Sequence, residues 1–157
     1  MQSRRKFVKR LGIAALASAA IMTTSPSAVW AATAEAPEVM VYRSEGCGCC
    51  LKWADHLREN GFTVTVENRD DMGAIKAQQG VPQDLQSCHT ATVAGYTIEG
   101  HVPAPDILRL LEEKSDARGL AVPGMPVGSP GMEHGSMKQP YEVVLFGEAG
   151  RSVFARH

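Results

Sequence analysis

Three of the chain's four cysteines lie within four consecutive residues, and this cluster constrains the fold more than any other feature. The segment Gly46-Cys47-Gly48-Cys49-Cys50 follows an apolar, strand-like run and precedes a helix-like run. Cys47 and Cys50 have the C-x-x-C spacing of a thioredoxin-type redox motif, which joins a strand to a helix. A dithiol enzyme needs only these two thiols. The third, Cys49, therefore indicates that the sulfurs gather around a thiophilic metal ion.

The first 34 residues have the composition of an export signal. A basic stretch with Arg4 and Arg5 precedes an apolar run over residues 11–22, and small residues that suit a cleavage site follow. The apolar run is shorter than the ~20 residues of a membrane-spanning helix. The arginine pair suits a twin-arginine signal, with a Sec signal as the alternative. We therefore expect residues 35–157 to lie in the periplasm, with no stable membrane insertion once the signal is removed.

The charge of the expected mature chain argues against nucleic acid as a partner. Residues 1–34 hold five of the 16 basic residues and none of the 17 acidic ones, so residues 35–157 carry a net charge of −6. Binding to phosphate groups requires clustered Lys and Arg. The remaining length of about 120 residues suits one domain with its own core.

The hydrophobic pattern predicts an α/β domain in which helices flank a mixed central sheet. Runs of alternating or continuous apolar residues predict strands, and apolar residues at three- and four-residue spacing predict helices. The order strand, helix, strand, helix, hairpin, helix is that of a thioredoxin-like fold, and a further hairpin is expected at the C-terminus. The predicted strands cover residues 38–43, 62–67, 90–93, 96–99, 141–146 and 151–155, and the predicted helices cover residues 49–60, 71–79 and a run that begins at Pro103.

This topology predicts that the fourth cysteine lies near the other three. In the thioredoxin arrangement the loop that enters the third strand faces the C-x-x-C turn, and Ser87-Cys88-His89-Thr90 occupies that loop. Cys50 should point inward from its helix. The other two cysteines of the cluster lie near the helix N-terminus, where the helix dipole stabilises thiolates. We therefore expect Cys47, Cys49, Cys50 and Cys88 to form one metal site.

Thiolate ligands favour copper(I). Sulfur is a soft donor that suits Cu(I) or Zn(II) and disfavours Mg, Ca and Mn. Structural zinc sites usually combine two separated cysteine pairs, and here the second pair is missing, because only Cys88 is distant and His89 is a crowded partner. Cu(I) accepts two or three sulfur ligands, and adjacent thiolates can bridge several ions. The sequence thus predicts Cu(I), with zinc as the weaker alternative.

Residues 119–140 are rich in Gly, Pro, Met and Ser and show no hydrophobic period, so a functional or disordered loop is predicted there. The segment contains Pro-Gly-Met twice, at residues 123–125 and 130–132. A thioether is a soft ligand. Met125 and Met132 are therefore candidates for additional metal ligands or for a lid over the cysteines, and simple packing is the alternative.

Two other interpretations remain open. Cys47 could be the nucleophile and Cys50 the resolving thiol of a thiol–disulfide oxidoreductase, which would not need Cys49. The four cysteines of an exported protein could also form structural disulfides, although only the Cys47–Cys50 pair has an easy geometry within the cluster. Among the histidines, His101 is predicted to be a structural turn residue rather than a ligand, and His56 to be solvated.

Taken together, the motifs resemble those of the CopG-like periplasmic copper-resistance proteins, long catalogued as a domain of unknown function. The resemblance implies a thioredoxin-like fold whose four cysteines hold copper, as a multinuclear thiolate-bridged cluster, in copper handling or in Cu(I)/Cu(II) conversion by a copper oxidoreductase. Other periplasmic copper-handling proteins are the expected partners. Glu45-Gly46 replaces an expected Pro-Thr or Pro-Ser, which could loosen the turn. The motifs that carry the resemblance are Cys47-Gly48-Cys49-Cys50, Ser87-Cys88-His89-Thr90, Glu99-Gly100-His101-Val102-Pro103, the loop from Gly119 to Met132, and Arg156-His157.

Overall fold

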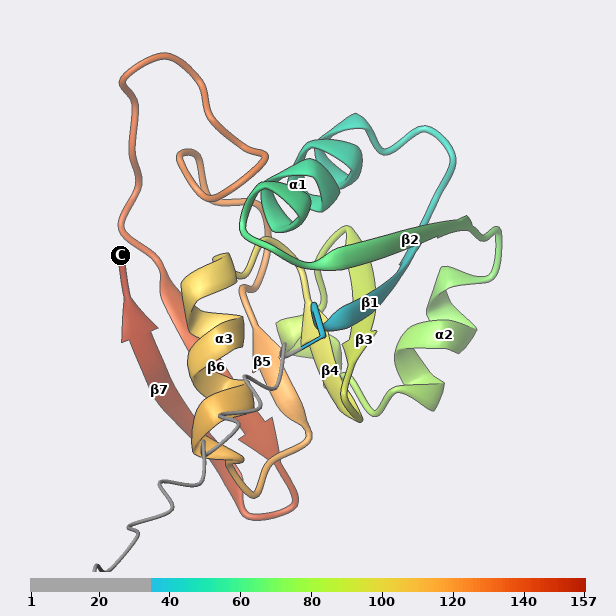
Figure 1. Ribbon diagram of the computed structural model, residues 1–157, viewed down its shortest axis with the longest axis vertical. Coiled ribbons are helices and arrows are strands. Elements are labelled where there is room, and N and C mark those ends of the chain that lie inside the picture. Colours follow the sequence, from blue (N-terminus) through green and yellow to red (C-terminus); the bar gives the residue numbers. More distant parts are fainter. Residues whose placement is uncertain (1–34) are drawn as a thin grey trace, which may run out of the picture. The chain divides into compact units, whose positions relative to one another are not determined.

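The structure, a computed structural model, describes residues 35–157, and the predicted export signal lies outside the described residues. Residues 35–157 form one compact unit. No helix in residues 35–157 is long and apolar enough to cross a membrane. Along the chain lie β1 (Glu38–Arg43), α1 (Gly48–Glu59), β2 (Thr63–Asn68), α2 (Met72–Gln78), a short 3₁₀ helix (Gln83–Leu85), β3 (His89–Val93), β4 (Tyr96–Glu99), α3 (Ala104–Glu113), β5 (Gly119–Ala121), β6 (Glu142–Gly147) and β7 (Gly150–Arg156), as Figure 1 shows.

A seven-stranded mixed sheet forms the centre of the unit, in the order β2-β1-β3-β4-β5-β6-β7. β1 and β2 are parallel because α1 connects them as a crossover, and β4 and β5 are parallel for the same reason, with α3 between them. The other neighbours are antiparallel. The mixed sheet, the flanking helices and the C-terminal hairpin confirm the predicted α/β class. The elements from β1 to α3 also follow the order that predicted a thioredoxin-like fold.

The apolar core lies between one face of the sheet and helices α1 and α3. Val39 and Val41 point to this face because side chains alternate along a strand. Trp53 of α1 is fully buried and donates from its indole N–H to the carbonyl oxygen of Val102, 2.8 Å away. The cluster comprises Val39, Val41, Trp53, Leu57, Phe62, Ala91, Val93, Ile98, Val102, Ala104, Ile107, Leu110, Leu120, Val122 and Val143.

The opposite face carries α2 and a buried ion pair. Lys76 Nζ donates to Glu99 Oε1 at 2.5 Å and to the Thr90 hydroxyl at 3.1 Å, and that hydroxyl donates to Glu99 Oε2 at 2.7 Å. The backbone N–H of Ser87 also donates to Glu99 Oε1, at 2.6 Å. Buried charges require such compensation. Through Glu99, the ion pair therefore also fixes the backbone of Ser87, which directly precedes Cys88.

The segment 119–140 begins with a strand that the sequence did not predict. Gly119–Ala121 form β5, which pairs with both β4 and β6. Three residues are too few to show strand alternation, and this explains the error. The rest of the segment is a loop with its own backbone hydrogen bonds. The N–H of Gly128 donates to the carbonyl oxygen of Met132 (3.0 Å), and the N–H of Met132 donates to the carbonyl oxygen of Ser129 (2.8 Å).

Candidate metal centre

The cysteine turn joins the end of β1 to the start of α1. Cys47 immediately precedes the helix, no side chain caps it, and its first turn carries no acidic residue. The free N–H groups and the positive helix end therefore face the turn. The buried side chain of Arg43 donates from Nη1 to the carbonyl oxygens of Ser44 at 3.0 Å and Cys47 at 2.7 Å. Arg43, predicted only as a strand residue, thus fixes the turn and places a positive charge beside the cysteines.

Strand pairing brings Cys88 to this turn. β1 and β3 are antiparallel, and Arg43 at the end of β1 pairs with His89 at the start of β3. The Sγ atom of Cys88 lies 3.9 Å from that of Cys49, which lies 3.5 Å from that of Cys47. The ligand atoms of Cys47, Cys49, Cys50 and Cys88 all lie within 4.8 Å of one another. The structure thus brings together the four cysteines that the sequence singled out, and their role as metal ligands stays a prediction.

The cysteine cluster is partly oxidised in this structure. A disulfide joins Cys47 to Cys50, whose Cα atoms are 5.5 Å apart. Cys49 and Cys88 are free and partly exposed. This is the one easy pairing that the sequence allowed within the cluster. Four thiolates are available to a metal ion only after this disulfide is reduced.

Two buried histidines lie against Cys88. His101 Nε2 is 3.0 Å from Cys88 Sγ, and His89 Nδ1 is 3.3 Å from the same atom. His101 Nδ1 lies 2.8 Å from the carbonyl oxygen of Pro130, which can only accept, so Nδ1 carries the proton. The lone pair of His101 Nε2 therefore faces the sulfur. His101 was predicted to be a structural turn residue, and it does lie in a bend, but the structure also places its ring against Cys88.

Burial governs the protonation of these groups. Burial raises the pKa of the Cys88 thiol to about 12, and the neighbouring Cys49 contributes to this rise. Burial also lowers the pKa of both His89 and His101, so both imidazoles are neutral at neutral pH. A neutral imidazole can bind a metal ion directly, whereas a thiol must first lose its proton. Any metal binding at Cys88 would therefore release a proton.

The loop that follows β5 lies beside α1 in Figure 1. A Cβ atom at Gly131 would lie 2.8 Å from the carbonyl oxygen of Cys49 and 2.8 Å from the backbone nitrogen of Trp53, so the loop backbone lies directly on the helix. Met132 lines a surface hollow of about 430 Å³ together with Cys49. Met125 is 53% exposed and does not line this hollow. The structure therefore places Met132 at the same hollow as Cys49 and leaves Met125 largely exposed.

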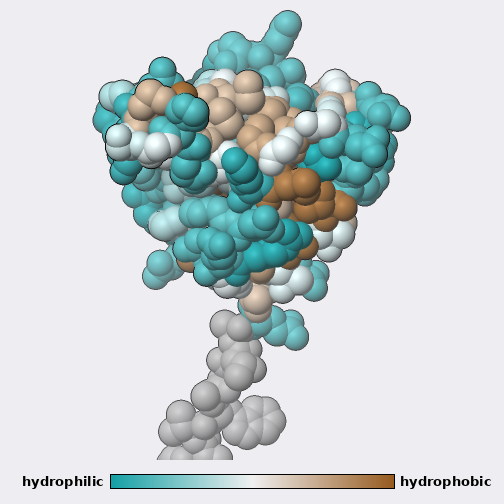
Figure 2. Space-filling view, turned by 90° about the horizontal axis from the view of Figure 1, so that it is seen from above, coloured by the Kyte–Doolittle hydropathy of each residue, from teal (hydrophilic) through white to brown (hydrophobic). Residues whose placement is uncertain are grey.

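The surroundings of this hollow are mixed in polarity. Figure 2 views the end of the described unit that carries α1 and the loop, and apolar side chains gather there within a largely hydrophilic face. The thiol of Cys49 lines the hollow and is partly exposed, so a metal ion can reach it from solvent. The hollow is lined by Gly48, Cys49, Lys52, Val127, Gly131, Met132, Glu133 and His134.

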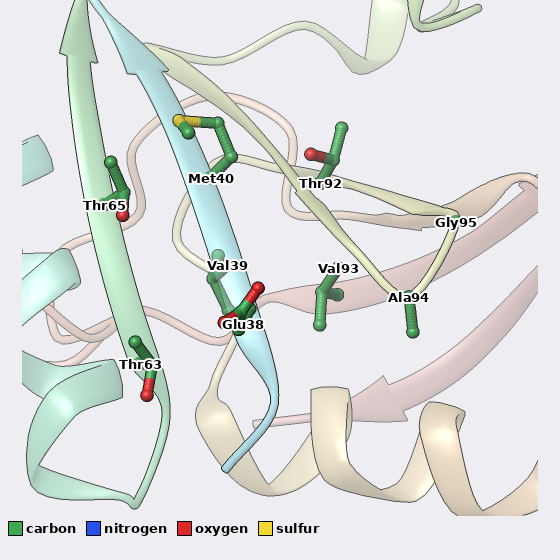
Figure 3. Close-up of a pocket in the computed structure, with 9 residues that line it drawn as sticks. All are labelled: Glu38, Val39, Met40, Thr63, Thr65, Thr92, Val93, Ala94 and Gly95. Atoms are coloured by element: carbon green, nitrogen blue, oxygen red, sulfur yellow. The ribbon is translucent and has the colours of Figure 1, made fainter. Parts of the chain in front are cut away.

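A second hollow, of about 280 Å³, lies at the start of β1 (Figure 3). The cysteine turn follows the other end of this strand. The lining side chains are threonines, small apolar groups, Met40 and one carboxylate, Glu38, and they include no cysteine or histidine. This hollow therefore provides no thiolate or imidazole chemistry. It is lined by Glu38, Val39, Met40, Thr63, Thr65, Thr92, Val93, Ala94 and Gly95.

A protein family and two solved structures are similar to this chain. Residues 85–132 match the family described as "Protein of unknown function, DUF411", and this stretch includes Cys88, both candidate methionines and both buried histidines. No curated protein sequence matches the chain.

The solved structures are of copper resistance protein CopG, in its Form 1 and Form 2. Each is 49% identical to this chain with a TM-score of 0.75, and each alignment covers 78% of this chain. The alignment covers 98% of the Form 1 chain and 99% of the Form 2 chain. Together with a cysteine cluster able to bind metal, this similarity supports a copper-related function. The chain therefore belongs to the family of copper resistance protein CopG.

Proposed function

We propose that this protein binds Cu(I) on the thiolates of Cys47, Cys49, Cys50 and Cys88, in copper resistance or homeostasis. The convergence of four sulfur atoms within 4.8 Å carries the proposal. Two metal–sulfur bonds of about 2.3 Å span up to ~4.6 Å, so neighbouring sulfurs at 3.5 and 3.9 Å can bind the same ion. The group contains no carboxylate, and such a soft donor set suits Cu(I). Shared thiolates would also allow several ions to bind as one cluster.

The disulfide suggests how the site would exchange electrons with copper. Oxidation of the Cys47/Cys50 dithiol to the disulfide releases two protons and two electrons, which reduce two Cu(II) ions to Cu(I). Cys49 and Cys88 stay reduced and remain available as Cu(I) ligands. A thiol reductant of the compartment would then restore the dithiol. We propose this balanced exchange as the way in which the protein cycles copper between its two oxidation states.

The same disulfide favours a second candidate function. A thiol–disulfide oxidoreductase would use Cys47, which is partly exposed, as the nucleophile and the fully buried Cys50 as the resolving thiol. That enzyme would not require Cys49 or any metal.

We further propose that residues 1–34 direct export and that residues 35–157 act in the periplasm as one metal-binding domain. The basic, apolar and small-residue regions of the leader support this location. The most direct partners would be other periplasmic proteins that deliver or accept copper.

A Cys49→Ser variant separates the two candidate functions. Anaerobic reduction of the parent, followed by copper loading and metal analysis, should give a copper-loaded protein, and the variant should lose most of this copper because the central sulfur of the group is absent. Its dithiol chemistry at Cys47 and Cys50, measured as reduction of a model disulfide, should be retained. Full copper stoichiometry in the variant, or zinc alone in the parent when copper is supplied, would overturn the four-thiolate site.

A further inference from the structure

We propose that Cys88, His89 and His101 form a second metal site, of one thiolate and two imidazoles, which shares the Cys88 sulfur with the four-cysteine cluster and takes a copper ion. One ligand atom of each of the three residues lies within 4.8 Å of the others. This inference rests on the proposed function only for the identity of the metal. The ligand geometry itself is independent of the other three cysteines.

Strand pairing brings the three ligands to one end of a hairpin. β3 pairs with β4 in an antiparallel hairpin, and Thr90 of β3 lies opposite Glu99 of β4. The residues just before Thr90 and just after Glu99 therefore lie at the same end of the hairpin. This end carries Cys88 and His89 on one strand and His101 beyond the other. The sulfur lies on the side of the cysteine turn, and the imidazoles are fully buried behind it.

His101 is oriented as a metal-bound histidine usually is. Its Nδ1–H donates to the carbonyl oxygen of Pro130 at 2.8 Å, and this bond fixes both the ring and its tautomer. Metal-ligating histidines commonly donate their second nitrogen to a backbone carbonyl in this way. The free lone pair on Nε2 points at Cys88 Sγ, 3.0 Å away. The ring therefore needs no change of tautomer to bind a metal ion held by this sulfur.

His89 also contacts the sulfur of Cys88 through a ring nitrogen. Nδ1 lies 3.3 Å from Cys88 Sγ, and the fully buried Nε2 has no hydrogen-bond partner in residues 35–157. Cys88 is therefore the one polar side chain with which this ring can share a hydrogen bond in the described part of the chain. Binding through Nδ1 would place a proton on the unpartnered Nε2, which costs free energy. His89 should consequently be a weaker ligand than His101.

The donor set differs from that of the cysteine cluster in the copper state that it stabilises. Four thiolates are soft and favour Cu(I), whereas imidazole is a harder donor that also binds Cu(II). Trigonal sites with two histidines and one cysteine are typical of copper proteins in which the ion changes oxidation state in place. A shared sulfur would join the two kinds of site directly. The second site is thus suited to hold copper as either Cu(I) or Cu(II).

The test isolates the second site by removing the first. In a Cys47→Ala, Cys49→Ala, Cys50→Ala variant of the chain, Cys88 is the remaining thiol, and Co(II) serves as a redox-stable probe under anaerobic conditions. We expect one Co(II) per chain with a sulfur-to-cobalt charge-transfer absorption. Adding His101→Gln should weaken Co(II) binding at least ~10-fold, and adding His89→Gln should weaken it less. The matched control, His157→Gln, removes a histidine that contacts Asp106 and should change nothing.

A second measurement uses the parent chain and does not depend on the folding of any variant. X-ray absorption of the copper-loaded protein should show imidazole scattering together with sulfur scattering, because His101 would bind the ion at Cys88. Copper surrounded only by sulfur in the parent, or unchanged Co(II) affinity after His101→Gln, would overturn the second site while leaving the four-thiolate proposal intact. Conversely, loss of the four-thiolate proposal would appear as unchanged copper content in Cys49→Ser, which does not bear on the second site.

Discussion

At the residue scale, the two Pro-Gly-Met copies form a natural internal comparison. Met132 lies at the hollow with Cys49, and Met125 is exposed, although their local sequences are the same. If the thioether of Met132 binds or shields copper, Met132→Leu keeps the apolar bulk but removes the sulfur. We expect Cu(I) binding to weaken by up to about tenfold and air oxidation to accelerate. Competition with a Cu(I) chelator and the rate of thiol loss in air would measure these effects.

Met125→Leu is the matched control and should leave both quantities unchanged. Circular dichroism should show the same fold for both variants and the parent, because each substitution conserves volume. If Met132→Leu binds Cu(I) as tightly as the parent and oxidises no faster, the methionine has a packing role only. The metal site would then be confined to the cysteines and histidines.

At the element scale, the backbone of the loop after β5 packs closely against α1 at Gly131. Gly131 has φ +84°, which disfavours other residues, and a Cβ there would lie 2.8 Å from two backbone atoms of α1. Gly131→Ala should therefore combine backbone strain with overpacking and reduce the free energy of unfolding by roughly 2–4 kcal/mol. Urea denaturation would measure this. Cu(I) binding should weaken as well, because Met132 would move away from Cys49 and the Pro130 carbonyl away from His101.

Gly124 provides the control for this loop. It has φ +69°, but a Cβ added there would meet no atom within 4 Å beyond its chain neighbours in the described residues. Gly124→Ala therefore carries the backbone strain without the steric contact. Equal destabilisation by the two substitutions would show that the contact between the loop and α1 contributes little to stability.

The junction of α1 with α3 should respond to pH. His56 Nε2 accepts a hydrogen bond from the backbone N–H of Ala104, 3.1 Å away, and burial lowers the pKa of His56 in the folded state. The unfolded chain, with a histidine pKa of about 6.5, therefore binds the proton more readily, and stability is lost as the pH falls through that value. His56→Gln retains an acceptor but does not titrate. The unfolding free energy of the variant should match that of the parent at pH 8 and exceed it at pH 5. If the unfolding free energies of the two proteins changed in parallel with pH, His56 would not contribute to the pH dependence.

The sequence predicted the elements well but not every contact between them. Apolar spacing located α1 to within one residue at each end, because Cys50, Trp53 and Leu57 do face the core. Apolar residues mark the buried face of α3 less clearly, because Ile107 and Leu110 are buried whereas Leu108 is 41% exposed. Helix faces depend on the packing partner as well as on spacing.

The cysteines could be predicted as one group, whereas the histidines could not. A short motif and a known strand order were enough to bring Cys88 to the turn. The position of His101 depends on two further facts, the register of the β3–β4 hairpin and the Pro130 carbonyl in a distant loop. The buried Lys76–Glu99 pair could not be predicted either, because charged residues in a sequence usually indicate solvent exposure.

At the scale of the whole molecule, the oxidation state of one cysteine pair should control how strongly copper stabilises the fold. A ligand that binds only the folded state adds about 2.7 kcal/mol to the unfolding free energy at 100 times its dissociation constant. The reduced protein offers four thiols, and the form with the Cys47–Cys50 disulfide offers two. Thermal denaturation with and without Cu(I) should therefore show a larger rise in Tm for the reduced form.

Cys49→Ser tests whether this rise comes from the cluster. Its Tm without metal should stay close to that of the parent, because Cys49 is partly exposed and lies outside the core, but its response to Cu(I) should be much smaller. Unfolded cysteines also bind Cu(I), which reduces the shift in every form but does not change their order. If the disulfide form gained as much from Cu(I) as the reduced form, Cys49 and Cys88 would suffice to bind copper. Cys47 and Cys50 would then serve as an electron donor pair and not as ligands.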